Sequence, residues 1–266
     1  MTDTDERRPD AFVRTDDGVS VAYQRRGTGL PLVLLAGQAN NHHWWDGVRE
    51  DFHGSRSTIT MDYRGTGASD APREGYSTPR FAGDVVAVLD SLGIERADVY
   101  GTSMGGRVAQ WVAARHPDRV RRLVLGCTSP GGPAAVGRDA SVRRALALPD
   151  PDAVRQTLTE LMYTPGWIAR HPGPYGTLGD PHMPPHARRG HLSASNRHDA
   201  WDALPSVAAP TLVLHGDQDR LTPPENARLL AARIPDATAR LLPGARHAYF
   251  EECRETAGAL VREFLG

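Results

Sequence analysis

Gly101-Thr102-Ser103-Met104-Gly105 is the stretch that decides the fold of this chain, because a serine between glycines separates two different kinds of element. A strand-like run, residues 97–100, precedes it, and a helix-like run, residues 106–116, follows and is stopped by Pro117. A serine at a sharp strand-to-helix turn exposes its hydroxyl toward a substrate, and the free N–H groups of the helix point to the same place. The pattern predicts a nucleophilic serine, provided that partners for Ser103 occur elsewhere; a chance match of common residues is the alternative.

Two later stretches supply the partners that a weakly nucleophilic serine needs. Residues 211–215 read as an apolar strand that ends in Gly216-Asp217-Gln218-Asp219, and residues 239–242 read as a strand followed by a turn that carries His247. Loops at the carboxyl ends of parallel strands meet at one edge of an open sheet. We therefore expect Ser103, an aspartate and His247 at one edge, where the aspartate orients the histidine and the histidine takes the serine proton.

The rest of the chain mostly alternates strands and helices. A hairpin around Asp16-Asp17-Gly18 comes first, short apolar strands are expected at 31–35 and 57–61, and a helix is expected at 80–92. This alternation predicts an α/β fold with a mostly parallel central sheet, flanking helices and right-handed crossovers.

The alternation breaks between residues 129 and 205, which are rich in Pro, Gly and His. Three helices are expected within this stretch, near residues 140–148, 152–162 and 185–195. We interpret residues 1–128 and 206–266 as the core and residues 129–205 as a helical cap, or lid, inserted after the sixth strand and shaping the substrate pocket. The alternative is a surface insertion that is merely tolerated.

These motifs resemble those of the α/β-hydrolase superfamily over nearly the whole chain, from about Phe12 to Leu265. The resemblance rests on Leu32–Gln38, Asp62–Ser69, Gly101–Gly106, Gly216–Asp219 and Gly244–His247. Within the superfamily the chain is most similar to the enol-lactonase, esterase and cofactor-free perhydrolase group. It does not resemble the dehalogenases, whose nucleophile at the elbow is an aspartate.

The resemblance implies a role for several further residues. It assigns the catalytic acid to Asp219, the third residue after Gly216, and leaves Asp217 as a turn residue. Some relatives carry the acid after the preceding strand, but Thr128-Ser129-Pro130 supplies none there, which favours Asp219.

The resemblance also places an oxyanion hole at two backbone amides, those of Gln38 and Met104. The chain has Ala36-Gly37 where the common pattern has His-Gly, a departure that concerns the geometry of this loop more than the chemistry. Gly37, Trp44 and Trp45 are candidates for binding substrate, although the tryptophans equally fit a role as core anchors.

Composition excludes several classes of function. The formal net charge of −1 provides no basic face for nucleic acid, and all 31 basic residues are arginine, which rules out Schiff-base and pyridoxal-lysine chemistry. Cys127 and Cys253 form neither a disulfide framework nor a metal pattern. No run is long enough to cross a membrane, and residues 1–10 lack a signal-peptide pattern. We expect a cytoplasmic protein whose partner is a small-molecule substrate and which needs no cofactor.

Histidines concentrate in the proposed cap, which raises the question of a metal. They are His171, His182, His186, His191 and His198. Pro184 and Pro185 separate two of them, so that those two do not share a helical face, and no metalloprotease or carboxylate-flanked pattern is present. We expect no metal site, and interpret most of these histidines as solvated or as packing residues.

The function that follows is hydrolysis of an ester or lactone through an acyl-serine. Hydrolysis of a carbon–carbon bond in a dienoate or β-diketone is an alternative, because the same triad supports it. A perhydrolase side activity is a second alternative. A ligand-binding or non-hydrolytic protein on the same fold is a third, since fold alone does not give function.

Overall fold

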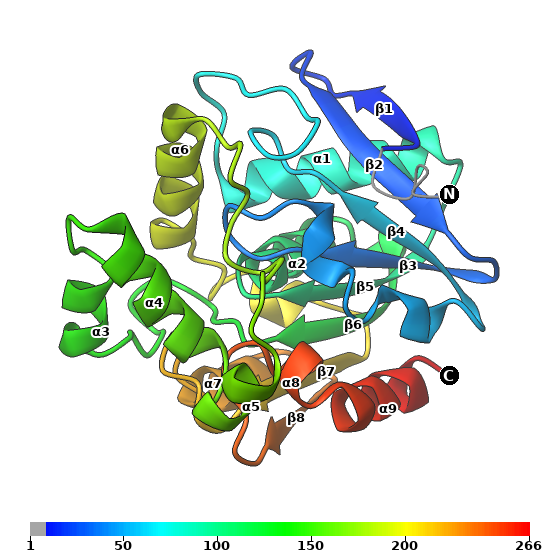
Figure 1. Ribbon diagram of the computed structural model, residues 1–266. Helices are drawn as coiled ribbons and strands as arrows, with labels where there is room; N and C mark the ends of the chain where they lie inside the picture. The colour runs from blue at the N-terminus through cyan, green and yellow to red at the C-terminus, as the bar shows by residue number, and fades with distance from the viewer. Residues whose placement is uncertain (1–8) are drawn as a thin grey trace, which may run out of the picture.

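The computed structural model of the chain describes residues 9–266 (Figure 1). Most of the N-terminal segment 1–10, which lacks a signal-peptide pattern, therefore lies outside the described residues. The described part contains an eight-stranded sheet with the order β1-β2-β4-β3-β5-β6-β7-β8. The strands are β1 (Ala11–Arg14), β2 (Ser20–Arg26), β3 (Leu30–Leu35), β4 (Arg56–Met61), β5 (Ala97–Thr102), β6 (Val120–Gly126), β7 (Thr211–Gly216) and β8 (Ala237–Leu242).

The sheet is mostly parallel, as the alternating pattern predicts. Only the pairs β1–β2 and β2–β4 are antiparallel. From β4 to β8 all pairs are parallel, with Leu34 opposite Tyr100 and Tyr100 opposite Val124 in the central strands. Strands covered on both faces carry continuous apolar runs, and Leu32 to Leu35 of β3 are all buried.

Helices pack against both faces of this sheet (Figure 1). The core helices are α1 (Thr78–Ser91), α2 (Met104–Arg115), α7 (Glu225–Arg233), α8 (Tyr249–Glu252) and α9 (Arg254–Leu265), with short 3₁₀ turns η1 (His42–Trp45), η2 (Arg49–Phe52), η3 (Pro117–Arg119) and η4 (Leu204–Ser206). Helix α1 begins two residues before the predicted start, because the Ser77 hydroxyl accepts a hydrogen bond from the amide of Arg80 and Pro79 fits the first turn.

The segment between β6 and β7, residues 129–205, is called the insert below. It contains α3 (Ala140–Ala145), α4 (Pro151–Met162), α5 (Pro165–Arg170) and α6 (Pro185–Asn196). Three of these match the predicted helices, and α5 was not expected. In Figure 1, α3, α4 and α6 lie to the left of the sheet, whereas α5 lies beside α8, where the amide of Thr164 donates to the Glu252 carboxylate.

The turn from β5 to α2 brings two backbones unusually close. Ser103 has a left-handed backbone, with φ of 55°, although it is not a glycine. Two residues later, a Cβ added to Gly105 would lie well inside van der Waals contact of the carbonyl oxygen of Leu35. Only glycine permits this approach of α2 to β3, and the approach fixes where the helix starts relative to Ser103.

The insert docks onto the core through His191 of α6. Its Nδ1 accepts a hydrogen bond from the amide of Ala39 at 3.2 Å, and its Nε2 donates to the carbonyl of Arg64 at 2.9 Å. The ring is fully buried and lies against Tyr63 and Phe81. Burial, opposed by the bond to Arg64 and assisted by the Arg188 charge, lowers the pKa of His191 to about 4. His191 is therefore a neutral bridge with a fixed tautomer.

Gly105→Ala should destabilise the protein, because its methyl group has no space beside the Leu35 carbonyl. We expect a loss of roughly 1–3 kcal/mol or more in the free energy of unfolding. Gly83→Ala in α1 is the matched control, since its methyl group meets nothing within 4 Å and alanine favours a helix interior by roughly 0.5–1 kcal/mol. Urea unfolding followed by circular dichroism compares them, and equal stability of the two variants would contradict this account of the turn.

The low pKa of His191 should appear in the pH dependence of stability. Between pH 6.5 and about 4 the unfolded chain binds a proton that the folded protein excludes, so His191 costs stability as the pH falls through that window. His191→Gln should flatten the dependence there, by up to about 1.4 kcal/mol per pH unit. His182→Gln, which replaces an exposed histidine of the insert, is the control and should follow the parent. An unchanged slope in His191→Gln, measured by urea unfolding from pH 4 to 7, would refute the bridge.

Candidate active site

Ser103 lies where β5 ends and α2 begins, and its backbone conformation is strained. Its φ and ψ are 55° and −121°, a region that costs a non-glycine residue roughly 1–3 kcal/mol. Two contacts hold this conformation: the Ser103 amide donates to the carbonyl of Gly126 at 2.9 Å, and the Thr128 hydroxyl donates to the carbonyl of Ser103 at 2.7 Å. Ser103 stays partly exposed while its neighbours Thr102 and Met104 are buried. The strain therefore presents the side chain at the start of α2.

The structure brings Asp219, and not Asp217, to His247. The Asp219 Oδ2 atom lies 2.7 Å from His247 Nδ1, and both side chains are almost fully buried. The Asp219 Oδ1 atom accepts hydrogen bonds from the amides of Leu221 and Thr222, which fixes the carboxylate in the loop after β7. Asp217 is exposed and accepts from the amide of Gly244 at 2.7 Å, a turn contact as the sequence predicts.

His215, at the end of β7, also contacts the Asp219 carboxylate. Its Nε2 atom lies 3.2 Å from Asp219 Oδ2 and 2.8 Å from the carbonyl oxygen of Thr222. Burial alone would raise the pKa of Asp219, but the charges and hydrogen bonds of His247 and His215 outweigh it and hold that pKa well below its usual range. Asp219 is therefore an anion at all ordinary pH values. From the sequence, His215 reads only as the last residue of a strand; its spacing of four residues from Asp219 was the available signal.

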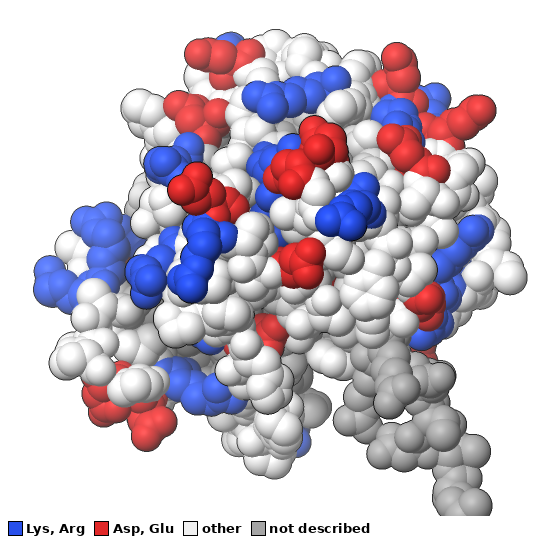
Figure 2. Space-filling view, turned by 90° about the horizontal axis from the view of Figure 1, so that it is seen from above, with Lys and Arg blue, Asp and Glu red and all other residues white. Residues whose placement is uncertain are grey.

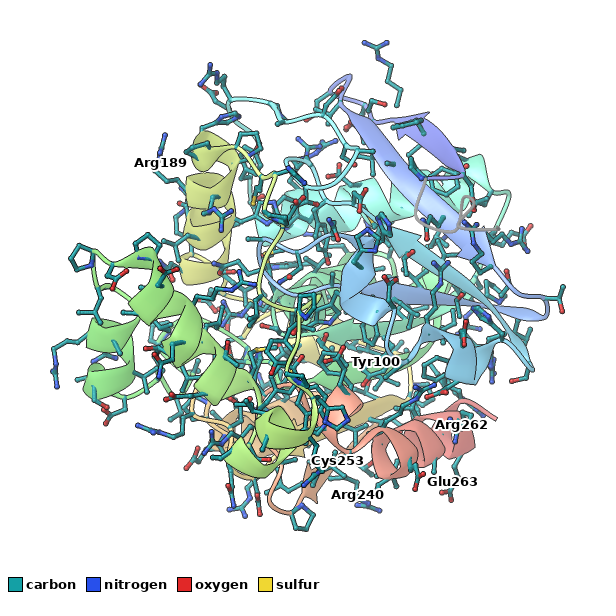
Figure 3. The ribbon with its side chains drawn as sticks, viewed as in Figure 1. Tyr100, Arg189, Arg240, Cys253, Arg262 and Glu263 are labelled. Carbon is teal, nitrogen blue, oxygen red and sulfur yellow. The ribbon has the colours of Figure 1, made fainter. Side chains whose placement is uncertain are left out.

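His247 has one ring nitrogen engaged and one free. With Nδ1 donating to the Asp219 carboxylate, Nε2 carries a lone pair, and it is buried with no hydrogen-bond partner within residues 9–266. The Tyr249 hydroxyl, two residues further on, lies 2.9 Å from the hydroxyl of Tyr100 on β5, which Figure 3 places in the interior beside α8. This contact ties α8, which follows the His247 turn, to β5, the strand that ends just before Ser103. No hydrogen bond yet joins Ser103 to His247; such bonds often form only with substrate.

Two backbone amides near Ser103 are available as donors. Met104 is the first residue of α2, so its N–H has no partner within the helix. Among the described residues, the amide of Gln38 likewise donates to no acceptor. The Gln38 loop is held by its neighbours: Asn40 Nδ2 donates to the Gln38 carbonyl at 2.8 Å, and the Ala39 carbonyl accepts from the amide of Asp180 in the insert at 2.7 Å.

The tryptophans next to this loop are core residues. Trp44 is 2% exposed and Trp45 is fully buried. The indole Nε1 of Trp44 donates to the Thr102 hydroxyl at 2.8 Å, and a Cβ on Gly37 would lie 2.6 Å from the Trp44 ring. Trp45 packs against Tyr100 and Phe250. The sequence leaves a pocket-lining and a core-anchoring role equally open for both tryptophans, and this placement favours the anchoring role. It also makes Gly37 a packing neighbour of Trp44.

A cavity of about 340 Å³ opens beside the proposed triad, between α3, α4 and the loops that follow β7 and β8. Leu161, Gln218 and Arg246 line it, and each is a neighbour of Asp219 or His247 in sequence or in space. Ser103 is not among its lining residues, so the cavity does not contain the proposed nucleophile.

The described residues contain no group of three or more His, Cys, Asp and Glu side chains suited to a metal ion. In the insert, His191 bridges to the core and His198 is buried with its Nδ1 2.9 Å from the Thr78 hydroxyl. Across residues 9–266, no helix combines the length and the apolar character needed to cross a membrane. Basic and acidic side chains alternate over most of the face shown in Figure 2.

Several known proteins are similar to this chain in sequence and in fold. A family model described as the α/β hydrolase fold matches residues 31–150, and one described as serine aminopeptidase S33 matches residues 180–254. A 2-hydroxymuconate semialdehyde hydrolase from Pseudomonas putida is 34% identical over 255 residues, which span 90% of this chain and 88% of the relative. A pimeloyl-[acyl-carrier protein] methyl ester esterase from Neisseria meningitidis is 29% identical, over 91% of this chain and 97% of the relative.

Solved structures agree with the sequence relatives. The structure of Est816, described as an N-acyl homoserine lactone degrading enzyme, superposes with a TM-score of 0.80 at 28% identity and covers 96% of this chain and 100% of its own. The sheet order, the strained serine at the β5–α2 turn and these similarities lead to one conclusion: the chain belongs to the α/β-hydrolase family.

Proposed function

We propose that this hydrolase cleaves a carboxylic ester or lactone through an acyl-serine intermediate. The observation that carries the proposal is the Asp219–His247 pair, 2.7 Å apart, whose unpartnered Nε2 lies at the same sheet edge as the strained Ser103. A serine hydroxyl becomes a nucleophile when a base beside it takes its proton, and the base keeps the right tautomer when a buried acid holds its other nitrogen.

Acylation uses each of these groups once. His247 Nε2 takes the hydroxyl proton as Ser103 Oγ attacks the substrate carbonyl carbon. The amides of Gln38 and Met104 stabilise the tetrahedral oxyanion, and the Asp219 carboxylate stabilises the imidazolium. His247 then gives its proton to the leaving oxygen, the bond from the acyl carbon to that oxygen breaks, and the acyl group stays on Ser103.

Deacylation repeats the sequence with water. His247 takes a proton from a water molecule, whose oxygen attacks the acyl carbon. The second tetrahedral species collapses, the Ser103 oxygen leaves with the proton from His247, and the carboxylic acid is released. The relatives named as a methyl ester esterase and as a lactone-degrading enzyme support an ester or lactone as the substrate.

Hydrolysis of a carbon–carbon bond is a second candidate. The relative at 34% identity is named as a hydrolase of 2-hydroxymuconate semialdehyde, and that compound has an acid and an aldehyde but no ester bond. The same serine, histidine and aspartate support attack on an aldehyde or ketone carbonyl, after which the bond from that carbon to its neighbouring carbon breaks and the departing carbon takes a proton. A preference for dienoates over simple esters would favour this candidate.

Ser103→Ala should abolish covalent labelling and turnover. A fluorophosphonate reacts with an activated serine by losing fluoride as the serine oxygen bonds to phosphorus, so we expect one adduct on the parent and none on the variant by intact mass. Hydrolysis of 4-nitrophenyl butyrate should fall by roughly 1,000-fold or more. A parent that is folded yet unlabelled and inactive would contradict the proposal and favour the ligand-binding alternative.

Asp219→Asn should lower kcat by roughly 10⁴-fold, because an amide no longer fixes the tautomer of His247 or stabilises its charged form. Asp217→Asn is the matched control: it makes the same change two residues away on an exposed side chain that contacts only the turn. We expect the control to keep near-parental kcat with the same ester. If Asp217→Asn lost as much activity as Asp219→Asn, the assignment of the acid would be wrong.

A further inference from the structure

The turn that carries His247 is bonded directly to the insert. The amide of Ala248 donates to the Met162 carbonyl at 2.9 Å, and the amide of His247 donates to the Leu161 carbonyl at 3.5 Å, a longer contact. Both carbonyls belong to the last turn of α4, where a helix leaves its final carbonyls without partners of its own. The backbone of the proposed catalytic base therefore completes the end of an insert helix.

The side chain of Arg246 strengthens this attachment. Its Nη1 donates to the carbonyl of Tyr163 at 3.0 Å and to that of Glu160. A positive charge at the C-terminal end of a helix is also favoured by the helix dipole. Arg246 and the two residues that follow it thus supply donors for four successive carbonyls, those of residues 160–163.

Glu252 of α8 joins the same two segments. One oxygen of its carboxylate accepts from the amide of Thr164 at 3.1 Å and from the Thr164 hydroxyl. The other oxygen accepts from the amide of Arg246 at 3.4 Å. The end of α4 is therefore bonded both to the residue before His247 and to the helix that follows it.

The core holds the residues on either side of this turn. Before it, the amide of Gln218 donates to the Ala245 carbonyl at 2.9 Å. After it, the Tyr249 hydroxyl lies 2.9 Å from that of Tyr100. Within residues 9–266, the backbone amides of residues 247–248 donate only to the insert. The insert, and not the core, thus sets the backbone position at the proposed base.

This backbone position matters because only one atom of the His247 ring is held. Asp219 bonds Nδ1 at 2.7 Å, and Nε2 has no partner in the described part of the chain. A ring held at one nitrogen turns when its backbone moves, and a misplacement of about 1 Å can cost roughly 100-fold in rate. The contact with α4 therefore bears on catalysis as well as on stability.

The simplest alternative is that Arg246 only caps α4 and stabilises the insert. That role would lower the stability of a variant and leave turnover by its folded fraction unchanged. The location of the cap favours more than that role, because its donor comes from 83 residues away in sequence, directly beside His247.

We propose that Arg246 is a positioning residue for His247, and that by binding the end of α4 it makes the insert part of the catalytic scaffold. This inference rests on the proposed function, since it concerns the base of that reaction. The insert then acts on the chemical step itself, in addition to any role in covering the substrate.

The first experiment needs no substrate. In Arg246→Ala, hydrogen exchange of the Ala248 amide, measured by NMR relative to the amides of β5, should speed up by roughly 10-fold or more. Arg240→Ala is the matched control: Arg240 is exposed at the lower edge of the molecule in Figure 3 and, within the described chain, donates only to the carbonyl of its neighbour Ala239. The control should keep the parental rate. Unchanged exchange at Ala248 in Arg246→Ala would overturn the attachment.

The second experiment separates positioning from stability. With 4-nitrophenyl butyrate, at a temperature where circular dichroism shows every variant to be folded, Arg246→Ala should lower kcat by roughly 10- to 100-fold and change KM less than about three-fold. Arg246→Lys should recover most of the loss, because both bonds come from one nitrogen and an ammonium group has three donors. A folded Arg246→Ala variant with parental kcat would show that Arg246 only stabilises the insert.

Chemical rescue gives a readout that a purely structural role would not produce. Arg246 is half-buried and lines the cavity of about 340 Å³, so guanidinium from solution can reach the end of α4 in Arg246→Ala. Low, non-denaturing concentrations of guanidinium chloride should raise kcat of this variant several-fold and leave the parent and Arg240→Ala unchanged. Urea, which has a similar shape and no charge, is the control. Equal responses of Arg246→Ala and Arg240→Ala to guanidinium would contradict the positioning role.

The two proposals fail in different ways. Ser103-dependent hydrolysis by the parent, with unchanged kcat in Arg246→Ala, would retain the hydrolase and overturn the positioning role. Faster exchange at Ala248 in Arg246→Ala, in a protein without Ser103-dependent hydrolysis, would retain the attachment of the His247 turn to the insert and overturn the serine hydrolase.

Discussion

The close approach of Gly105 to the carbonyl of Leu35 is the contact on which the rest of the site depends. It sets the first turn of α2, which begins at Met104, directly against the end of β3 and the carbonyl of Ala36. The left-handed backbone of Ser103 is held by two hydrogen bonds: its amide donates to the Gly126 carbonyl, and its carbonyl accepts from the Thr128 hydroxyl. A side chain at residue 105 would separate the two halves of the proposed oxyanion hole.

The charges around the site are distributed unevenly. Asp219 is a buried anion, and two histidine neighbours and two backbone amides stabilise the negative charge of its carboxylate. Within residues 9–266, the guanidinium of Arg107 donates only to neutral acceptors, the Ser195 carbonyl and the Ser129 hydroxyl. The charged groups of such a buried site are held in place before the substrate binds. Groups that are already oriented contribute to catalysis because they need not rearrange during the reaction.

Much of this fold is local enough to be read from sequence. The apolar runs at 31–35 and 211–215 predict their strands, and the glycine-flanked Ser103 predicts the β5–α2 turn because the motif and its geometry are contiguous. The preference for Asp219 over Asp217 matches the 2.7 Å contact with His247. Helix α5 was not predicted, because Pro165 and Gly166 are typical of loops. The signals for it were present: Thr164 caps the helix and Pro165 fits its first turn.

What could not be predicted depends on contacts between distant segments. Nothing near Trp45 in sequence shows that Tyr100 and Phe250 enclose it. The lack of a carboxylate partner at Arg107 is likewise invisible, because a sequence with 32 acidic residues offers many candidates and only the fold shows that none of those described comes near. Contacts of this kind are set by topology, which local patterns do not encode.

Because the insert is attached to the Gln38 loop, it cannot be exchanged between homologues as an independent unit. The amide and the carbonyl of Ala39 are both bonded to the insert, through His191 and Asp180, and the Asn40 side chain accepts from the amide of Gly179. The Gln38 loop thus belongs to the core but is held by the insert, which lies far from it in the sequence. The Ala39 contacts use its backbone, so a transplanted insert must itself bring counterparts of His191 and Asp180, whereas Asn40, which contributes its side chain, must match the incoming backbone at residue 179.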